Sequence, residues 1–172
     1  MDHKTFLPQI TLFILLLLYA GLLKAQENRI PWIPLMENAP DTIAGRNGAA
    51  PTYGEIGIPI YPGSFLTSVY IEVFENDTDG DSPLPGIYLV TSDDKEKVIQ
   101  FYKDTLNKSN GWIYNDEYFI FTLGTTDNPF SRTIPGIAIR EESGESFDLI
   151  GAEEDIKKSL KTRVKIIYIP VK

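Results

Sequence analysis

The chain has 172 residues, a net charge of −8 and no cysteine, and its only histidine is His3. Disulfide bridges, thiolate nucleophiles and cysteine-rich zinc sites are therefore excluded. The 24 acidic residues outnumber the 16 basic ones, which argues against an extended phosphate-binding surface, so nucleic acid is not an expected partner.

Residues 1–25 have the composition of a secretory signal peptide. Lys4 lies in a short polar start, and an apolar stretch follows that reaches Leu23. This stretch is intermediate between the core of a signal peptide, about 7 to 15 residues, and a membrane span of about 20. Ala25 suits the last position before a cleavage site, although Leu23 is bulkier than the residue preferred at the third. We predict export to the periplasm or medium with cleavage after Ala25; an uncleaved membrane anchor is the alternative.

Cleavage would change the chemistry of the chain as well as its length. It would remove 25 of the 172 residues and leave 147, which is enough for one domain with its own core. Loss of Asp2, Lys4 and Lys24 would change the net charge from −8 to −9, and loss of His3 would remove the last imidazole. No membrane span is expected in the remaining chain.

Residues 26–57 are rich in proline and glycine and contain only scattered apolar residues such as Trp32. This composition is typical of a linker or a loosely docked arm. We therefore predict that a single domain occupies residues 58–172.

The domain is expected to begin with two strands. Residues 68–74 and 86–91 are both rich in β-branched and aromatic side chains, and the loop over 76–85 separates them.

A helix over residues 93–107 follows. Its apolar residues recur at three-and-four spacing, which places one apolar stripe along the helix. Asp93 and Glu96 have the spacing of a capping box at its start. The stripe consists of Val98, Phe101, Tyr102 and Leu106.

The rest of the chain returns to strand character. Residues 112–114 and 118–123 predict a hairpin that turns at 115–117. Further strands are expected over 134–140, 147–150 and 163–169, with a short helix over 152–160. This order predicts an α+β fold, with a mostly antiparallel sheet of about five to seven strands and one principal helix packed on one face.

Several short motifs occur in a characteristic order. Tyr61-Pro62-Gly63 precedes the first strand, Val98 with Phe101-Tyr102 lies in the predicted helix, and Gly111-Trp112 follows it. The chain is similar in this respect to a loose group of uncharacterised exported bacterial proteins, over roughly residues 58–169. The resemblance implies a shared small α+β fold and assigns no catalytic residue.

One candidate nucleophile is Ser92, because Ser92-Asp93-Asp94-Lys95 matches the Ser-x-x-Lys motif of penicillin-binding proteins and serine β-lactamases. The accompanying Ser-Asp-Asn and Lys-Thr-Gly motifs are absent from the sequence. Ser92 also lies where the predicted helix begins, so we interpret it as part of the helix start.

The acidic loop between the first two strands is a candidate cation site. No lysine or arginine occurs in residues 47–94, and acids alternate along 76–81 as the ligands of calcium loops do. The pattern departs from an EF-hand, since Gly80 comes too early and Tyr88 stands where the closing glutamate belongs. A polar connecting loop and a weak calcium site therefore both remain open. The candidate ligands are Asp77, Asp79 and Asp81.

Positive charge gathers near the end of the chain, where the last 16 residues hold six lysines and arginines. Acids at 153–155 directly precede them, which favours local ion pairing, with a docking strip for an acidic partner as the alternative.

These features favour a non-catalytic exported domain that binds or scaffolds a protein or glycan in the cell envelope or outside the cell. Two alternatives remain. The first is a carboxylate-dependent glycan hydrolase, with paired acids in a cleft lined by aromatic residues such as Trp112 or Tyr118. The second is a weakly calcium-binding envelope protein.

Overall fold

The computed structural model describes residues 28–36, 49–70, 84–106, 111–124, 131, 133–145 and 149–171. Residues 1–25, for which a signal peptide is predicted, lie outside the described part of the chain. The elements in chain order are α2 (Tyr53–Ile56), β1 (Phe65–Tyr70), β2 (Gly86–Thr91), α3 (Lys95–Thr105), β3 (Trp112–Asn115), β4 (Ile120–Leu123), β5 (Gly136–Glu141), α4 (Glu154–Ser159) and β6 (Thr162–Ile167).

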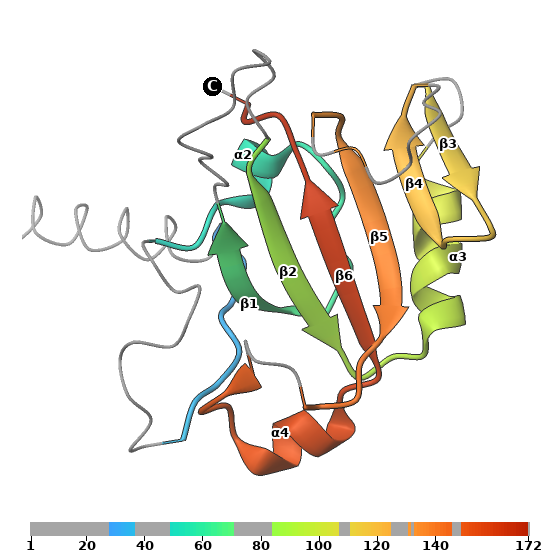
Figure 1. Ribbon diagram of the computed structural model, residues 1–172. Helices are drawn as coiled ribbons and strands as arrows, with labels where there is room; N and C mark the ends of the chain where they lie inside the picture. The colour runs from blue at the N-terminus through green and yellow to red at the C-terminus, as the bar shows by residue number, and fades with distance from the viewer. Residues whose placement is uncertain are drawn as a thin grey trace, which may run out of the picture.

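Six strands form one sheet in the order β1-β2-β6-β5-β4-β3, and every neighbouring pair is antiparallel. The last strand in the sequence, β6, therefore lies in the middle of the sheet, between β2 and β5 (Figure 1). The predicted α+β class and the predominantly antiparallel sheet are confirmed.

One face of the sheet carries the main core. Strand residues alternate between faces, so Ile87 and Leu89 of β2 share a face with Val164 and Ile166 of β6. These four side chains are fully buried and pack in one core with the buried Val98, Ile99, Tyr102 and Leu106 of the α3 region. Figure 1 views the sheet from the opposite side, with α3 and α2 behind it.

Helix α3 is the predicted principal helix, but its start differs from the predicted capping box. Asp94 is the N-cap residue, and its side chain makes no capping hydrogen bond. The Asp93 carboxylate accepts hydrogen bonds from the Tyr61 hydroxyl at 2.6 Å and from the Lys97 ammonium at 2.8 Å. Because Asp93 is held by these partners, it ties α3 to the segment that leads into β1.

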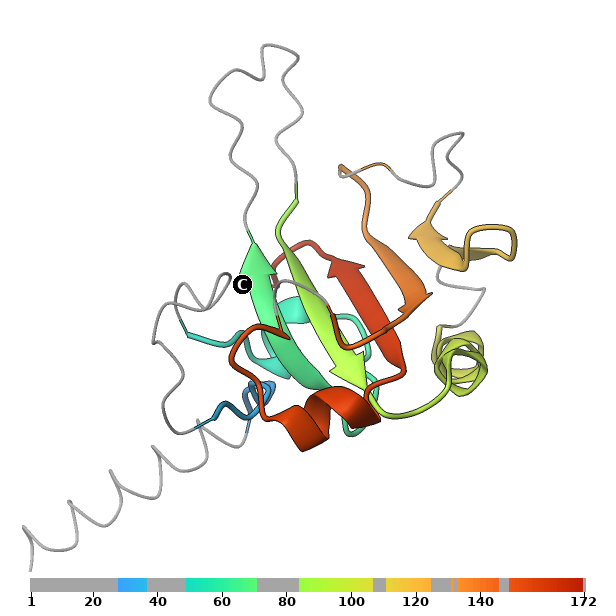
Figure 2. The same ribbon diagram turned by 60° about the horizontal axis from the view of Figure 1, so that its bottom comes forward.

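A second, smaller core lies at one end of the other face. Val90 of β2 packs there with Leu149, Ala152 and Leu160, so α4 and the turn before it cover that end (Figure 2). Residues 149 and 150 form a turn. The predicted strand over 147–150 is therefore wrong in its described part, because Leu149 is buried beneath α4 and not paired in the sheet.

Residues 28–36 pack against the domain. Ile30 and Ile33 are 1% and 2% exposed. The Ile33 N–H donates to the Leu66 carbonyl at 2.9 Å, and the Leu66 N–H donates to the Pro31 carbonyl at 2.7 Å. This part of the segment predicted as a linker or loosely docked arm thus contributes to the core and lies along the β1 edge.

Among the described residues, no helix is both long and apolar enough to cross a membrane.

Candidate functional site

The centre of the second sheet face is not covered by any described helix, and we call it the open face. It presents Tyr88 from β2, Arg163 and Lys165 from β6, and Ala138 and Arg140 from β5. The register places Lys165 between Tyr88 and Ala138, and it places Arg163 directly opposite Arg140. Small Ala138 leaves room above the sheet.

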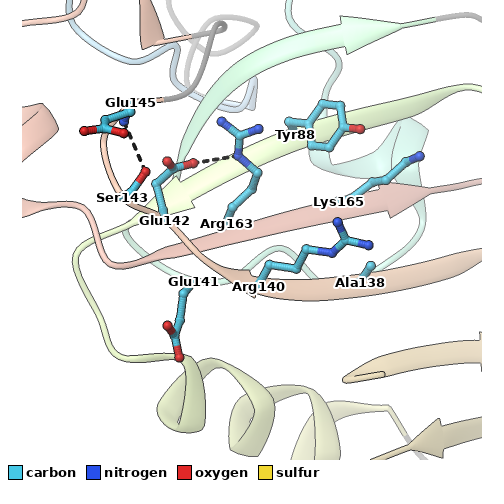
Figure 3. Close-up of a pocket in the computed structure, with 9 residues that line it drawn as sticks. All are labelled: Tyr88, Ala138, Arg140, Glu141, Glu142, Ser143, Glu145, Arg163 and Lys165. Atoms are coloured by element: carbon cyan, nitrogen blue, oxygen red, sulfur yellow. Dashed lines mark hydrogen bonds and ion pairs between the residues drawn. The ribbon is translucent and has the colours of Figure 1, made fainter. Parts of the chain in front are cut away.

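A hollow of about 630 Å³ lies over these strands (Figure 3). It is framed at one end by the loop that follows β5, which contributes Glu142, Ser143 and Glu145. The volume is within the range of small-molecule sites, about 300 to 1,000 Å³. The full lining is Tyr88, Ala138, Arg140, Glu141, Glu142, Ser143, Glu145, Arg163 and Lys165.

Two tyrosines support the cations on the floor of the hollow. The Lys165 ammonium lies 5.1 Å from the ring centroid of Tyr70 and 5.7 Å from that of Tyr88. The Arg163 guanidinium lies 5.5 Å from the Tyr88 centroid. Since aromatic ring faces attract cations, these contacts hold both basic groups against the sheet.

Glu142 forms the most buried ion pair of the hollow. Its carboxylate accepts a hydrogen bond from Nε of Arg163 at 2.7 Å, and the two side chains are 4% and 19% exposed, respectively. The second carboxylate oxygen accepts from the Gly144 N–H at 3.0 Å. Glu142 therefore anchors the loop after β5 to the centre of the sheet.

Two of the acids that line the hollow are paired with cations. Figure 3 shows Glu141 directed toward α3, where it pairs with Lys95 at 3.1 Å, and Glu142 directed toward Arg163. The other end holds Arg140, whose side chain extends toward Ala138, and Lys165, whose ammonium lies near the rings of Tyr70 and Tyr88.

A second, smaller hollow of about 190 Å³ adjoins the first, since Ala138, Arg140 and Lys165 line both. Its other walls are mainly isoleucines with two hydroxyl side chains, and its described lining contains no carboxylate. We call it the apolar recess. The remaining lining residues are Ile120, Thr122, Ser131, Ile134, Gly136, Ile137 and Ile167.

The predicted calcium ligands Asp77, Asp79 and Asp81 lie outside the described residues. Within the described ranges, no group of three or more acidic or histidine side chains is arranged to hold a metal ion. The calcium site stays a prediction.

The aromatic residues named for a glycan cleft are not brought together. Trp112 lines a different hollow, of about 930 Å³, whose described lining is apolar apart from Lys103 and contains no acid. Tyr118 lies exposed in the turn between β3 and β4.

The acids with displaced pKa values favour the charged form. A hydrogen bond from Lys97, followed by that from Tyr61, lowers the pKa of Asp93, and a hydrogen bond from Lys157 lowers that of Glu154. The backbone N–H of Thr52 lowers the pKa of Glu55. Protonation of a glycosidic oxygen needs a carboxyl group whose pKa is raised.

Ser92 lies at the start of α3, and several of the basic residues near the chain end form ion pairs. Ser92 is exposed just before α3, and Lys95 pairs with Glu141. Lys157 pairs with Glu154 at 2.6 Å and Lys161 with Asp94 at 3.0 Å. The predicted local pairing is therefore found for Lys157, whereas the partner of Lys161 is distant in the sequence.

Sequence reasoning missed the open face as a site. The signal was the alternation Arg163-Val164-Lys165-Ile166, because a period of two places both cations on one face of a strand. Arg140 and Ala138 show the same alternation in β5. Their approach to Lys165 depends on the pairing of β5 with β6, which the sequence pattern does not reveal.

Comparison of the chain with protein-family models, with curated protein sequences and with solved structures finds no match in any of the three.

Proposed function

We propose that this protein is an exported, non-catalytic binding domain of the cell envelope or extracellular space, and that it binds its ligand on the open face of the sheet. The observation that carries the proposal is the hollow of about 630 Å³ over β2, β6 and β5, whose lining contains three basic and three acidic side chains. Export rests on the composition of residues 1–25.

The construction of the hollow supports a binding role. Its floor comes from three adjacent strands, and side chains on strands are held more precisely than side chains on loops. Lys165 and Arg163 are further held by the tyrosine rings, and Glu142 by Arg163. Such a surface presents its polar groups in a fixed arrangement, which reduces the entropy lost on binding.

The side chains of the hollow support a role without catalysis. The sequence offers no cysteine and no histidine other than His3, so neither a thiolate nor an imidazole can act there. Glu142 is engaged by Arg163 and the Gly144 N–H, and Glu141 is directed toward Lys95. Neither acid faces the other across the hollow (Figure 3).

Filling the hollow tests the proposal. The Ala138→Trp variant would place an indole in the hollow, and Gln100→Trp would place one on exposed α3, behind the sheet. A panel of neutral glycans, acidic glycans, peptides and small organic acids is screened by melting temperature, since a ligand of the native state raises it. We expect a ligand that stabilises the wild type and Gln100→Trp but not Ala138→Trp.

Two outcomes would overturn the proposal. If the same ligand stabilises Ala138→Trp equally well, binding does not occur on the open face. If mass spectrometry after prolonged incubation finds the ligand converted to a product, the domain is catalytic. The melting temperatures of the ligand-free variants show whether each substitution leaves the domain folded.

A further inference from the structure

The open face carries a charge imbalance that is specific to one position. Arg140 and Arg163 lie opposite each other on neighbouring strands, and Glu142 pairs with Arg163. Among the described residues, no carboxylate forms an ion pair with Arg140. Like charges in opposed strand positions repel, so an anion beside Arg140 would stabilise this part of the sheet.

Arg140 also marks the junction of the two hollows. It lines both of them together with Lys165 and Ala138. An anionic group at this junction would contact two basic side chains, and the guanidinium of Arg140 can donate two parallel hydrogen bonds to a carboxylate.

The apolar recess determines what else the ligand carries. Its volume of about 190 Å³ exceeds the roughly 150 Å³ of a cavity that holds benzene, so a ring or a short branched chain would fit. Ile120, Ile134 and Ile167 supply its apolar walls, and its described lining contains no carboxylate that would repel an acid. An inorganic anion would leave this apolar surface unused.

The surrounding charge favours a small ligand over a polymer. Glu142 and Glu145 lie at the loop end of the same hollow, and the chain as a whole carries a net charge of −8. An extended polyanion would lie against these acids and be repelled along its length, whereas a small acid brings only one carboxylate to Arg140.

We infer that the open face binds a small organic acid, with its carboxylate between Arg140 and Lys165 and its apolar group in the recess beside Ile134. The inference deepens the proposed function and rests on it, because it names the ligand class of the same surface.

Three related probes separate the contributions of charge and apolar surface. Phenylacetate carries both a carboxylate and a ring, benzyl alcohol carries the ring without the charge, and acetate carries the charge without the ring. Their binding to the purified protein is measured by calorimetric titration and by chemical-shift changes. We expect phenylacetate to bind at least tenfold more tightly than either of the other probes.

The Arg140→Gln variant tests the position of the carboxylate. It removes the guanidinium from an exposed side chain, and the expected loss of phenylacetate affinity is at least tenfold. Lys158→Gln is the matched control, since Lys158 is an exposed cation on α4 and its loss changes the net charge equally. Lys158→Gln should retain wild-type affinity. The melting temperatures of both variants show whether they are folded.

Each other result overturns the inference. Equal binding of benzyl alcohol would show that Arg140 is not used, and equal binding of acetate would show that the recess is not used. Equal weakening in both variants would show that only the net charge matters. If none of the three probes binds while another ligand is lost in Ala138→Trp, the ligand class is wrong and the proposed binding face stands. If no ligand is lost in Ala138→Trp, both the inferred ligand class and the proposed binding face are wrong.

Discussion

Arg140 of β5 lies directly opposite Arg163 of β6, so two guanidinium side chains leave neighbouring strands on the same face. Opposed like charges destabilise a sheet. Glu142 forms an ion pair with Arg163 at 2.7 Å, and no described acid does so with Arg140. We therefore expect Arg140 to lower the stability of the domain.

Replacement of Arg140 by glutamine should accordingly stabilise the protein. We expect the free energy of unfolding to rise by about 0.2–1 kcal/mol at low salt. The gain should shrink at 1 M salt, where the Debye length falls to about 3 Å. Urea unfolding at both salt concentrations measures the effect, with Lys158→Gln as the charge-matched control. A loss of stability in Arg140→Gln at low salt would contradict the prediction.

Glu141 and Glu142 are neighbours in sequence, but their side chains differ in exposure to solvent. The Glu141 side chain is 79% exposed in its pair with Lys95, whereas that of Glu142 is 4% exposed. Glu142→Gln should therefore lower the free energy of unfolding by about 1–3 kcal/mol, because it leaves the Arg163 charge without its counter-ion. Glu141→Gln should cost less than about 0.5 kcal/mol.

Urea denaturation of the two variants compares these costs directly, and a double-mutant cycle with Arg163→Gln isolates the coupling between Glu142 and Arg163. Equal effects of the two substitutions would argue against a buried role for Glu142.

The sequence predicted those elements whose residues follow a regular period. β2 has the predicted bounds of 86–91, and the other strands and α3 differ mainly at their ends. The prediction was less complete before Ile58, because Ile30 and Ile33 are too few apolar residues to define a period and Pro31 lies between them. Ile30 donates its N–H to the Pro51 carbonyl and Ile33 donates its N–H to the Leu66 carbonyl, and both contacts depend on the folded domain.

The open face was less predictable than the fold because it depends on contacts between distant segments. The alternation in β6 places Arg163 and Lys165 on one face, but it does not reveal that β6 inserts between β2 and β5. That insertion brings Tyr88 and Arg140 to the same hollow. The pairing of Glu142 with Arg163 likewise follows from the course of the chain after β5.

Ile33 tests whether the segment before the sheet belongs to the core. Ile33→Ala should lower the free energy of unfolding by about 2–4 kcal/mol, because it leaves a cavity beside Val90 and Leu149. Met36 lies in the same segment but is 43% exposed, so Met36→Ala should change stability by less than about 0.5 kcal/mol. Denaturant unfolding of both variants provides the comparison. A small effect at both positions would indicate a loosely attached arm.

Tyr61 couples the free energy of unfolding to pH in the alkaline range. Burial, followed by its hydrogen bond to Asp93, raises the pKa of Tyr61 to about 12 from a usual value of 10.0. The unfolded chain therefore releases the phenol proton before the folded domain does, so the contribution of Tyr61 to stability is constant below pH 10 and is lost as pH rises from 10 to 12.

Other tyrosines whose pKa is also raised, including Tyr102, contribute to this decline in stability, so the test compares variants. The free energy of unfolding of Tyr61→Phe should decline with pH less steeply than that of the wild type, and the difference in slope should correspond to at most one proton. Tyr53→Phe, at an exposed position, serves as the control. Urea midpoints at half-unit pH steps give the slopes. Parallel curves for the wild type and Tyr61→Phe would show that Tyr61 does not titrate in this range.

Gly86 and Tyr70 are paired across β1 and β2, and the Tyr70 ring occupies the space that a side chain at Gly86 would need. A methyl group there would overlap the ring and displace it from Lys165, whose ammonium lies 5.1 Å from the ring centroid. Gly86→Ala should therefore destabilise the domain by about 1 kcal/mol, although alanine is otherwise preferred to glycine in a strand by roughly 0.5–1 kcal/mol.

In a Tyr70→Val background the same substitution should become neutral or stabilising, because the ring is gone. Urea unfolding of all four proteins yields the coupling energy, and an equal loss in both backgrounds would mean that the alanine clashes with the backbone and not with Tyr70.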